Sequence, residues 1–237
     1  GVLSELAHAD AAARDRQMQR LARLMAVERI RALTLSDEIK TAIIEMQRIG
    51  LDPGKLDANQ PHMDWGLRHG TTNVAIARWL VRARRAKRAL DFVDLAEENA
   101  IRGGQLLSLA KLRVIRAQAH LQLNGRSDAT SALLSSIRLL GKQPFRRFIL
   151  DEGLSLQPVV QAALDGERVK VPIDTVQRHQ LSEIMHHWSS GGISSTEGQS
   201  CDRQGESKRR YLELLAQGFS NKEIGRVMGV SSNTVKY

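Results

Sequence analysis

The chain has 237 residues, of which 42% are hydrophobic and 26% charged, and this composition excludes an intrinsically disordered polypeptide. Its formal net charge of +9 favours an anionic partner, nucleic acid first, although an ordinary solvated basic surface is the alternative. The single cysteine, Cys201, excludes an intrachain disulfide and a cysteine-based zinc site.

No run of about 18 apolar residues and no signal-peptide pattern occurs, so we expect a cytoplasmic protein with no membrane contact. Aromatic residues make up only 4%, which favours a core of Leu, Ile, Val, Ala and Met in close-packed helices. The sequence opens directly into a helical pattern without an initial Met, so we expect a fragment of a longer protein.

Apolar residues recur at helical spacing over residues 1–164, with little strand signal. In the first clear pattern Leu21, Leu24, Met25 and Ile30 share much of one face. A second helix is expected over residues 35–49, ended by a glycine, and residues 52–70 have the composition of a loop.

Four further helices are predicted, at residues 72–84, 87–102, 105–123 and 127–140. They form two hairpins that resemble each other, since residues 85–90 and 125–130 are offset by 40 residues. Ala89 and Ala129 follow the two turns, where antiparallel helices must approach closely. Such hairpins bury their apolar faces only by stacking, which indicates a helical-repeat array; a plain helical bundle is the alternative.

Two last helices are expected at residues 156–164 and 174–188. Residues 189–205 are rich in Ser, Gly and Gln and are typical of a flexible linker. We therefore divide the chain into a helical-repeat region (1–188), a linker (189–205) and a terminal region (206–237).

The terminal region carries the most specific pattern. A short helix ends at Gly218, and Ser220 with Glu223 forms a capping box that begins a second helix. That helix ends at Gly229, and Ser231 is the next N-cap. Two short helices joined by a tight turn containing glycine describe a helix-turn-helix.

Three motifs of this region, Leu-Leu-Ala-Gln-Gly (214–218), Ser-Asn-Lys-Glu-Ile (220–224) and Ser-Ser-Asn-Thr-Val-Lys (231–236), resemble the LuxR-type helix-turn-helix family. The resemblance implies a DNA-binding transcriptional regulator in which the last helix enters the major groove. It implies phosphate contact by Thr234, base-edge positions for Lys236 and Tyr237, and backbone approach by Lys222. The DNA-binding residues it implies are Lys222, Ser232, Thr234, Lys236 and Tyr237.

Two features depart from the family pattern. Residues 207–210 are basic where the family has acidic residues, and the sequence stops at Tyr237, inside the expected recognition helix. We therefore predict an all-α protein, a TPR-like helical-repeat array followed by a truncated helix-turn-helix.

A looser resemblance to large MalT-like regulators rests on residues 51–54, on the Ala-rich hairpins, and on Phe-Ile-Leu-Asp-Glu-Gly (148–153). It implies that the repeats sense a small-molecule inducer or a partner protein, and that the intact parent forms a homodimer or oligomer. The parent would add an ATP-binding module, but no phosphate-binding loop is found in this sequence. The alternative is a helical-repeat interaction scaffold with a degenerate, non-functional helix-turn-helix.

No catalytic constellation, metal site or cofactor motif is identified, and we expect no enzyme activity. Glu183 and His186 lie one turn apart, beside His187, and could suggest a metal site. No further ligand stands at a suitable spacing. The basic run between Arg78 and Arg88 is interpreted as a solvated face, with an auxiliary phosphate patch as the alternative. Of the three tryptophans, at least one is expected in the core.

Overall fold

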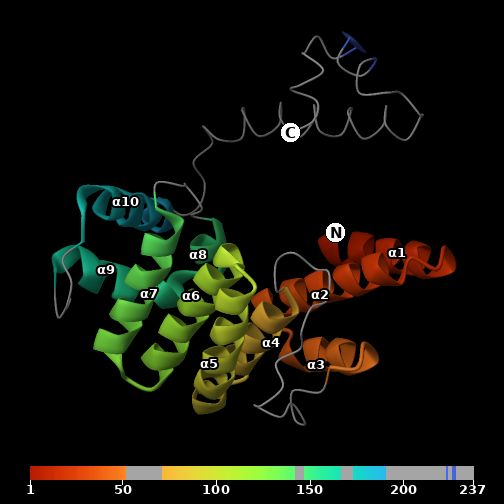
Figure 1. Cartoon of the computed structure of the whole chain (residues 1–237), viewed down its shortest axis with the longest axis horizontal. Coiled ribbons are helices and arrows are strands. Elements are labelled where there is room, and N and C mark those ends of the chain that lie inside the picture. Colours follow the sequence, from red (N-terminus) through yellow and green to blue (C-terminus); the bar gives the residue numbers. More distant parts are fainter. Residues whose placement is uncertain (52–70, 142–146, 167–172, 191–222, 224–225, 228–237) are drawn as a thin grey trace. The chain divides into compact units, whose positions relative to one another are not determined.

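The computed structural model describes residues 1–51, 71–141, 147–166, 173–190, 223 and 226–227. Within these ranges it contains α-helices, one short 3-10 helix and no strand, so the all-α prediction is confirmed. Their bounds are α1 (Val2–Asp15), α2 (Gln19–Leu35), α3 (Ile39–Arg48), α4 (Thr71–Arg82), α5 (Ala86–Arg102), α6 (Leu106–Gln122), α7 (Arg126–Leu140), α8 (Arg147–Asp151), η1 (Leu154–Leu156), α9 (Gln157–Asp165) and α10 (Thr175–Ser189) (Figure 1).

The chain divides into two compact units, Gly1–His186 and His187–Tyr237. The first unit holds nearly all of the described helices. The predicted linker lies mostly outside the described residues, as does most of the terminal region.

Five tight turns of one geometry connect the helices from α1 to α3 and from α4 to α7. Each has three residues, and the middle one is left-handed: Gln17 (φ 55°), Asp37 (62°), Arg84 (60°), Gly104 (63°) and Asn124 (62°). The third turn residue donates its N–H to the carbonyl five positions back, at 2.7–2.9 Å in all five turns. This is the Schellman arrangement, which satisfies carbonyl groups at the helix end.

These turns recur at a fixed spacing. The left-handed residues Arg84, Gly104 and Asn124 follow one another at intervals of 20 positions, as do Gln17 and Asp37. Four positions after the third turn residue stands a buried apolar residue, which is Ala22, Ala42, Ala89, Leu109 or Ala129. The 40-residue offset read from the sequence therefore joins two turns of equal geometry, with a further equal turn between them.

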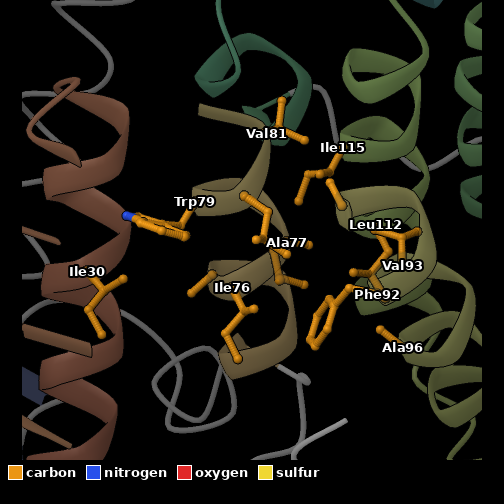
Figure 2. Packing of buried hydrophobic residues seen from close by; sticks show 14 of the residues in the cluster. Ile30, Ile76, Ala77, Trp79, Val81, Phe92, Val93, Ala96, Leu112 and Ile115 are labelled. Atoms are coloured by element: carbon orange, nitrogen blue, oxygen red, sulfur yellow. The ribbon is translucent and has the colours of Figure 1, made fainter. Parts of the chain in front are cut away.

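Helices α2, α4 and α6 form an inner row in which each packs against the next, and α3, α5 and α7 pack chiefly against this row. The central helix α4 is enclosed, because residues 72–81 are all buried. Figure 2 shows its side chains directed both ways, Trp79 toward Ile30 of α2, and Val81 toward Ile115 of α6. The core of the unit therefore surrounds α4.

Three features of the fold differ from the sequence-based expectation. Residues 2–15 form a separate helix, α1, which the apolar pattern alone did not separate from α2. The helix expected from residue 35 begins only at Ile39, because the left-handed turn at Asp37 intervenes. Residues 147–156 carry α8 and η1, which were not predicted.

Candidate functional site

The DNA-binding residues predicted from the sequence, Lys222, Ser232, Thr234, Lys236 and Tyr237, lie outside the described residues. Three neighbouring positions are described, and Glu223, Arg226 and Val227 are all helical and exposed. The helix predicted after Ser220 thus has helical backbone at these positions, and Arg226 presents a cation to solvent.

The helical unit holds a buried ion pair between residues far apart in the sequence. Arg78, in the middle of α4, donates to Glu152 Oε1 from Nε at 2.7 Å and from Nη2 at 2.6 Å. The two side chains are only 4% and 2% exposed. Charge-assisted hydrogen bonds of this kind offset the cost of removing both charges from water.

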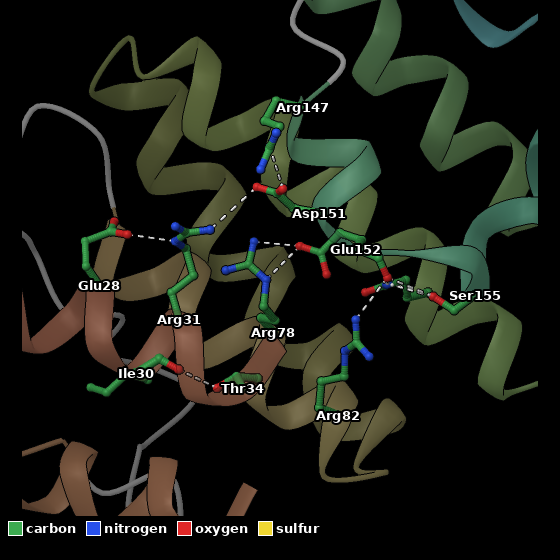
Figure 3. A network of polar contacts seen from close by, with 11 residues as sticks. Glu28, Ile30, Arg31, Thr34, Arg78, Arg82, Arg147, Asp151, Glu152 and Ser155 are labelled. Carbon is green, nitrogen blue, oxygen red and sulfur yellow. Dashed lines mark hydrogen bonds and ion pairs between the residues drawn. The ribbon is translucent and has the colours of Figure 1, made fainter. Parts of the chain in front are cut away.

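The backbone at Glu152 is held as well. Its carbonyl oxygen accepts hydrogen bonds from Arg82 Nη2 at 2.9 Å and from Gln118 Nε2 at 3.3 Å. Gln118 Nε2 also donates to Ser155 Oγ at 3.1 Å. Side chains of α4 and α6 therefore converge on the peptide that follows α8 (Figure 3).

The preceding residue extends the network to α2. Arg31 lies 3.5 Å from Asp151 Oδ2 and pairs with Glu28 at 2.7 Å, and Arg147 donates to Asp151 Oδ1 at 2.9 Å (Figure 3). Burial lowers the pKa of the neighbouring Lys111 ammonium on α6, and the Arg78 charge lowers it further, whereas Glu28 opposes this shift. The consecutive carboxylates of Asp151 and Glu152 thus interact with cations from α2, α4 and α6, the three helices of the inner row.

The interpretation of the basic run as a solvated face is wrong for its first two members. Arg78 is buried and Arg82 is half-buried, and both contact Glu152. Their i, i+4 spacing places both on the side of α4 that faces Glu152. Arg84 and Lys87 are exposed.

One tryptophan of the helical unit is a core residue, as expected. Trp79 is 3% exposed, and its Nε1 donates to the Ile39 carbonyl at 3.1 Å. The Arg85 guanidinium lies 5.4 Å from the centre of its ring, a cation–π contact.

A second group of charges joins α1, α2 and α3. Arg48 donates to Asp10 Oδ2 at 2.9 Å and also to Glu45, and Arg14 donates to both Asp10 oxygens at 2.6 and 3.1 Å. Arg29 lies 3.8 Å from Glu45. Burial raises the pKa of Glu45 despite the Arg29 charge, and the nearby Asp10 raises it further.

Neither a metal site nor a membrane-spanning helix occurs among the described residues. His179 pairs with Glu183 at 3.5 Å, and no group of three potential metal ligands gathers in the described ranges. Among the same residues, every helix is too short or too polar to span a bilayer.

The sequence signal for the Arg78–Glu152 pair was faint. A cation stood inside an otherwise apolar run, and an acidic pair stood inside the apolar tract 148–156. Each feature is ordinary alone, and only the fold brings the two together.

Comparison with known proteins adds one match. Residues 208–237 match the family model described as "Bacterial regulatory proteins, luxR family". No curated protein and no solved structure matches the chain. The matched residues include every predicted DNA-binding position and the whole helix-turn-helix pattern, and they support a transcription regulator that binds DNA through this segment.

Proposed function

We propose that the protein is a DNA-binding transcriptional regulator, with residues 206–237 as its LuxR-type helix-turn-helix. The single observation that carries this proposal is the match at residues 208–237, which coincides with the capping and turn pattern. In this proposal Thr234 and Lys222 contact phosphates, and Ser232, Lys236 and Tyr237 lie in the major groove. A DNA-binding role would place the protein in the cytoplasm of a bacterial cell.

We further propose that residues 1–188 are a TPR-like sensor of the MalT-like kind, joined through the linker 189–205. Helical hairpins that recur at 40 residues and stack in a row support this reading. The sensed molecule would be a small inducer or a partner protein. Homodimer formation would double the number of recognition helices on DNA.

The proposal is tested by fluorescence anisotropy with labelled duplex DNA over a range of salt concentrations. We expect affinity that falls steeply with salt, because Lys and Arg contacts to phosphates release counterions. Lys222→Ala should reduce the magnitude of the slope of log K against log salt by about 0.9, the value for one phosphate contact. Lys40→Ala, at an exposed position on α3, is the matched control and should leave the slope unchanged.

Absence of DNA binding at low salt would contradict the proposal. In that case the helical-repeat scaffold with a degenerate helix-turn-helix becomes the better interpretation. Equal slopes for Lys222→Ala and Lys40→Ala would show that binding does not use the predicted segment.

A further inference from the structure

Residues 147–153, which we term the strap, join α7 to the later helices by way of α8. The strap docks by its consecutive carboxylates, Asp151 and Glu152, and by the Glu152 carbonyl. Its anchors come from α2, α4 and α6, the three helices of the inner row (Figure 3). Side chains from separate hairpins thus bind a short peptide of their own chain as they would bind an acidic ligand.

The docked state leaves buried polar atoms unsatisfied. Within the described part of the chain, Arg82 Nε, Gln118 Oε1 and Glu152 Oε2 are buried and have no hydrogen-bond partner. All three belong to residues that hold the strap in place. A buried polar atom without a partner costs free energy, so the docked strap is less stable than its ion pairs alone suggest.

The strap ends at a glycine with positive φ. Gly153 has φ 79° and ψ −170°, a conformation almost confined to glycine, and no atom lies within 4 Å of the position a Cβ would take. At the end of α7, Gly141 has φ 56° and ψ −127°, which is likewise unfavourable for other residues. The backbone on either side of α8 therefore turns at glycines.

Removal of the strap would change the charge of the face beneath it. Glu152 and Asp151 would leave, and the cations Arg31, Arg78, Arg82 and Lys111 would remain, with Glu28 as the carboxylate that the described residues place among them. A face with this excess of guanidinium and ammonium groups is complementary to an acidic segment.

We propose that the strap is an internal acidic ligand, which undocks as a unit while the hairpins stay folded, and which an acidic peptide segment of a partner can replace. The buried side chains of Phe148 and Ile149 hold the strap in its docked position, so the open state is the minor one. This proposal goes beyond the DNA-binding role, and its test does not use DNA.

The test measures how fast a buried thiol on the strap reacts with a thiol reagent. Ile149→Cys on α8 is compared with Ile115→Cys on α6, each in the full chain with Cys201→Ser, because both isoleucines are almost fully buried. We expect the thiol at 149 to react at least about tenfold faster, with a weaker dependence on urea, because only local opening is required. Glu152→Gln should accelerate the reaction at 149 by a further factor of about ten. At 115 it should change the reaction rate only by the factor by which it changes the equilibrium constant of global unfolding.

A synthetic peptide with the sequence of residues 147–156 then serves as the acidic partner. It should increase the reaction rate at position 149 in a saturable manner, and the same peptide with Asn and Gln in place of its two acidic residues should not. The proposal is overturned by equal rates and urea dependences at 149 and 115, or by equal effects of the two peptides. If Ile149→Cys fails to fold, hydrogen exchange of the unmodified chain compares the amides of residues 152–153, which bond back into α8, with those of α6 by the same criteria.

Discussion

The two groups of buried acids in the helical unit have different designs. Around Asp10 and Glu45, three arginines serve two carboxylates, and the side chains of Arg14, Arg29 and Arg48 remain 30–49% exposed. At the strap, Arg78 and Glu152 have 4% and 2% exposure, and the ion pair links residues 74 positions apart. In the first group the carboxylates share arginines that touch water, whereas the Glu152 carboxylate pairs, among the described residues, with the buried Arg78 alone.

Burial and redundancy, more than the number of ion pairs, therefore decide how much stability a substitution removes. A charge left without its partner near water can be hydrated or can move to another partner. A charge left alone inside the core can do neither, so its full desolvation cost remains.

The largest effect is expected for Glu152→Ala. It leaves the Arg78 guanidinium buried and uncompensated, and we expect the free energy of unfolding to fall by about 3–5 kcal/mol. Urea denaturation measures the loss. Glu98→Ala, which removes an exposed pair with Arg102 at 4.0 Å, is the control and should cost less than about 0.5 kcal/mol. Equal losses for both variants would contradict the contrast between buried and exposed pairs.

A smaller loss of stability is expected for Arg48→Ala, although Arg48 makes more hydrogen bonds to carboxylates than Arg78 does. Arg14 still serves Asp10 and Arg29 still faces Glu45, so we expect a loss of about 1.5 kcal/mol, at the low end for bonds to charged groups. The double variant Arg14→Ala with Arg48→Ala should lose more than the sum of the single losses, because Asp10 then loses both of the arginines that pair with it in the described residues. Strict additivity in this double-mutant cycle would show that the arginines are not redundant.

The pH dependence of stability gives a separate test of the group around Asp10 and Glu45. Because burial raises the pKa of Glu45 above its usual 4.5, the folded state binds this proton more tightly than the unfolded state. The contribution of Glu45 to stability is therefore fully favourable below the unfolded pKa and is lost as pH rises through the folded pKa. The stability of the native sequence relative to Glu45→Gln should rise as pH falls from 7 to 4. A difference that is constant, or that falls, over this range would contradict the sign.

The smallest effect tests the backbone that the two regions share. Asp37 lies in the turn before α3, Arg84 lies in the turn after α4, and both are exposed with φ near +60°. Asp37→Gly and Arg84→Gly remove the steric strain of a side chain in the left-handed conformation, and they also increase the conformational freedom of the unfolded chain. We expect the first effect to be larger, so each substitution should raise the free energy of unfolding by about 0.5 kcal/mol. Thermal denaturation should give equal gains in both turns. Unequal gains would show that the turns differ by more than their side chains.

The sequence predicted what depends on near neighbours. The helices at 71–82, 86–102, 106–122 and 126–140 follow from apolar spacing, and the turn at Gly104 follows from glycine. The turns at Gln17 and Asp37 carry no glycine, so nothing local marked α1 as a separate helix. The terminal motif was likewise recognised from local capping, and its predicted contacts remain predictions.

The buried pair could not be predicted, because Arg78 looks like a surface arginine in sequence. Its partner is 74 residues away, and pairing requires the array to bring the residue after α8 to the middle of α4. Such long-range pairing is a product of tertiary stacking and leaves no periodic pattern. For the same reason, the docking of residues 147–153 could not be predicted from the sequence.

That long separation has a consequence for how the protein is made. Ribosomes release the chain from the N-terminus, and the hairpins α4–α5 and α6–α7 can close from local contacts as soon as they emerge. Arg78 must wait until residue 152 is also released before it meets its carboxylate. The nascent array therefore carries a solvated guanidinium in its central helix until the chain as far as residue 152 has been released.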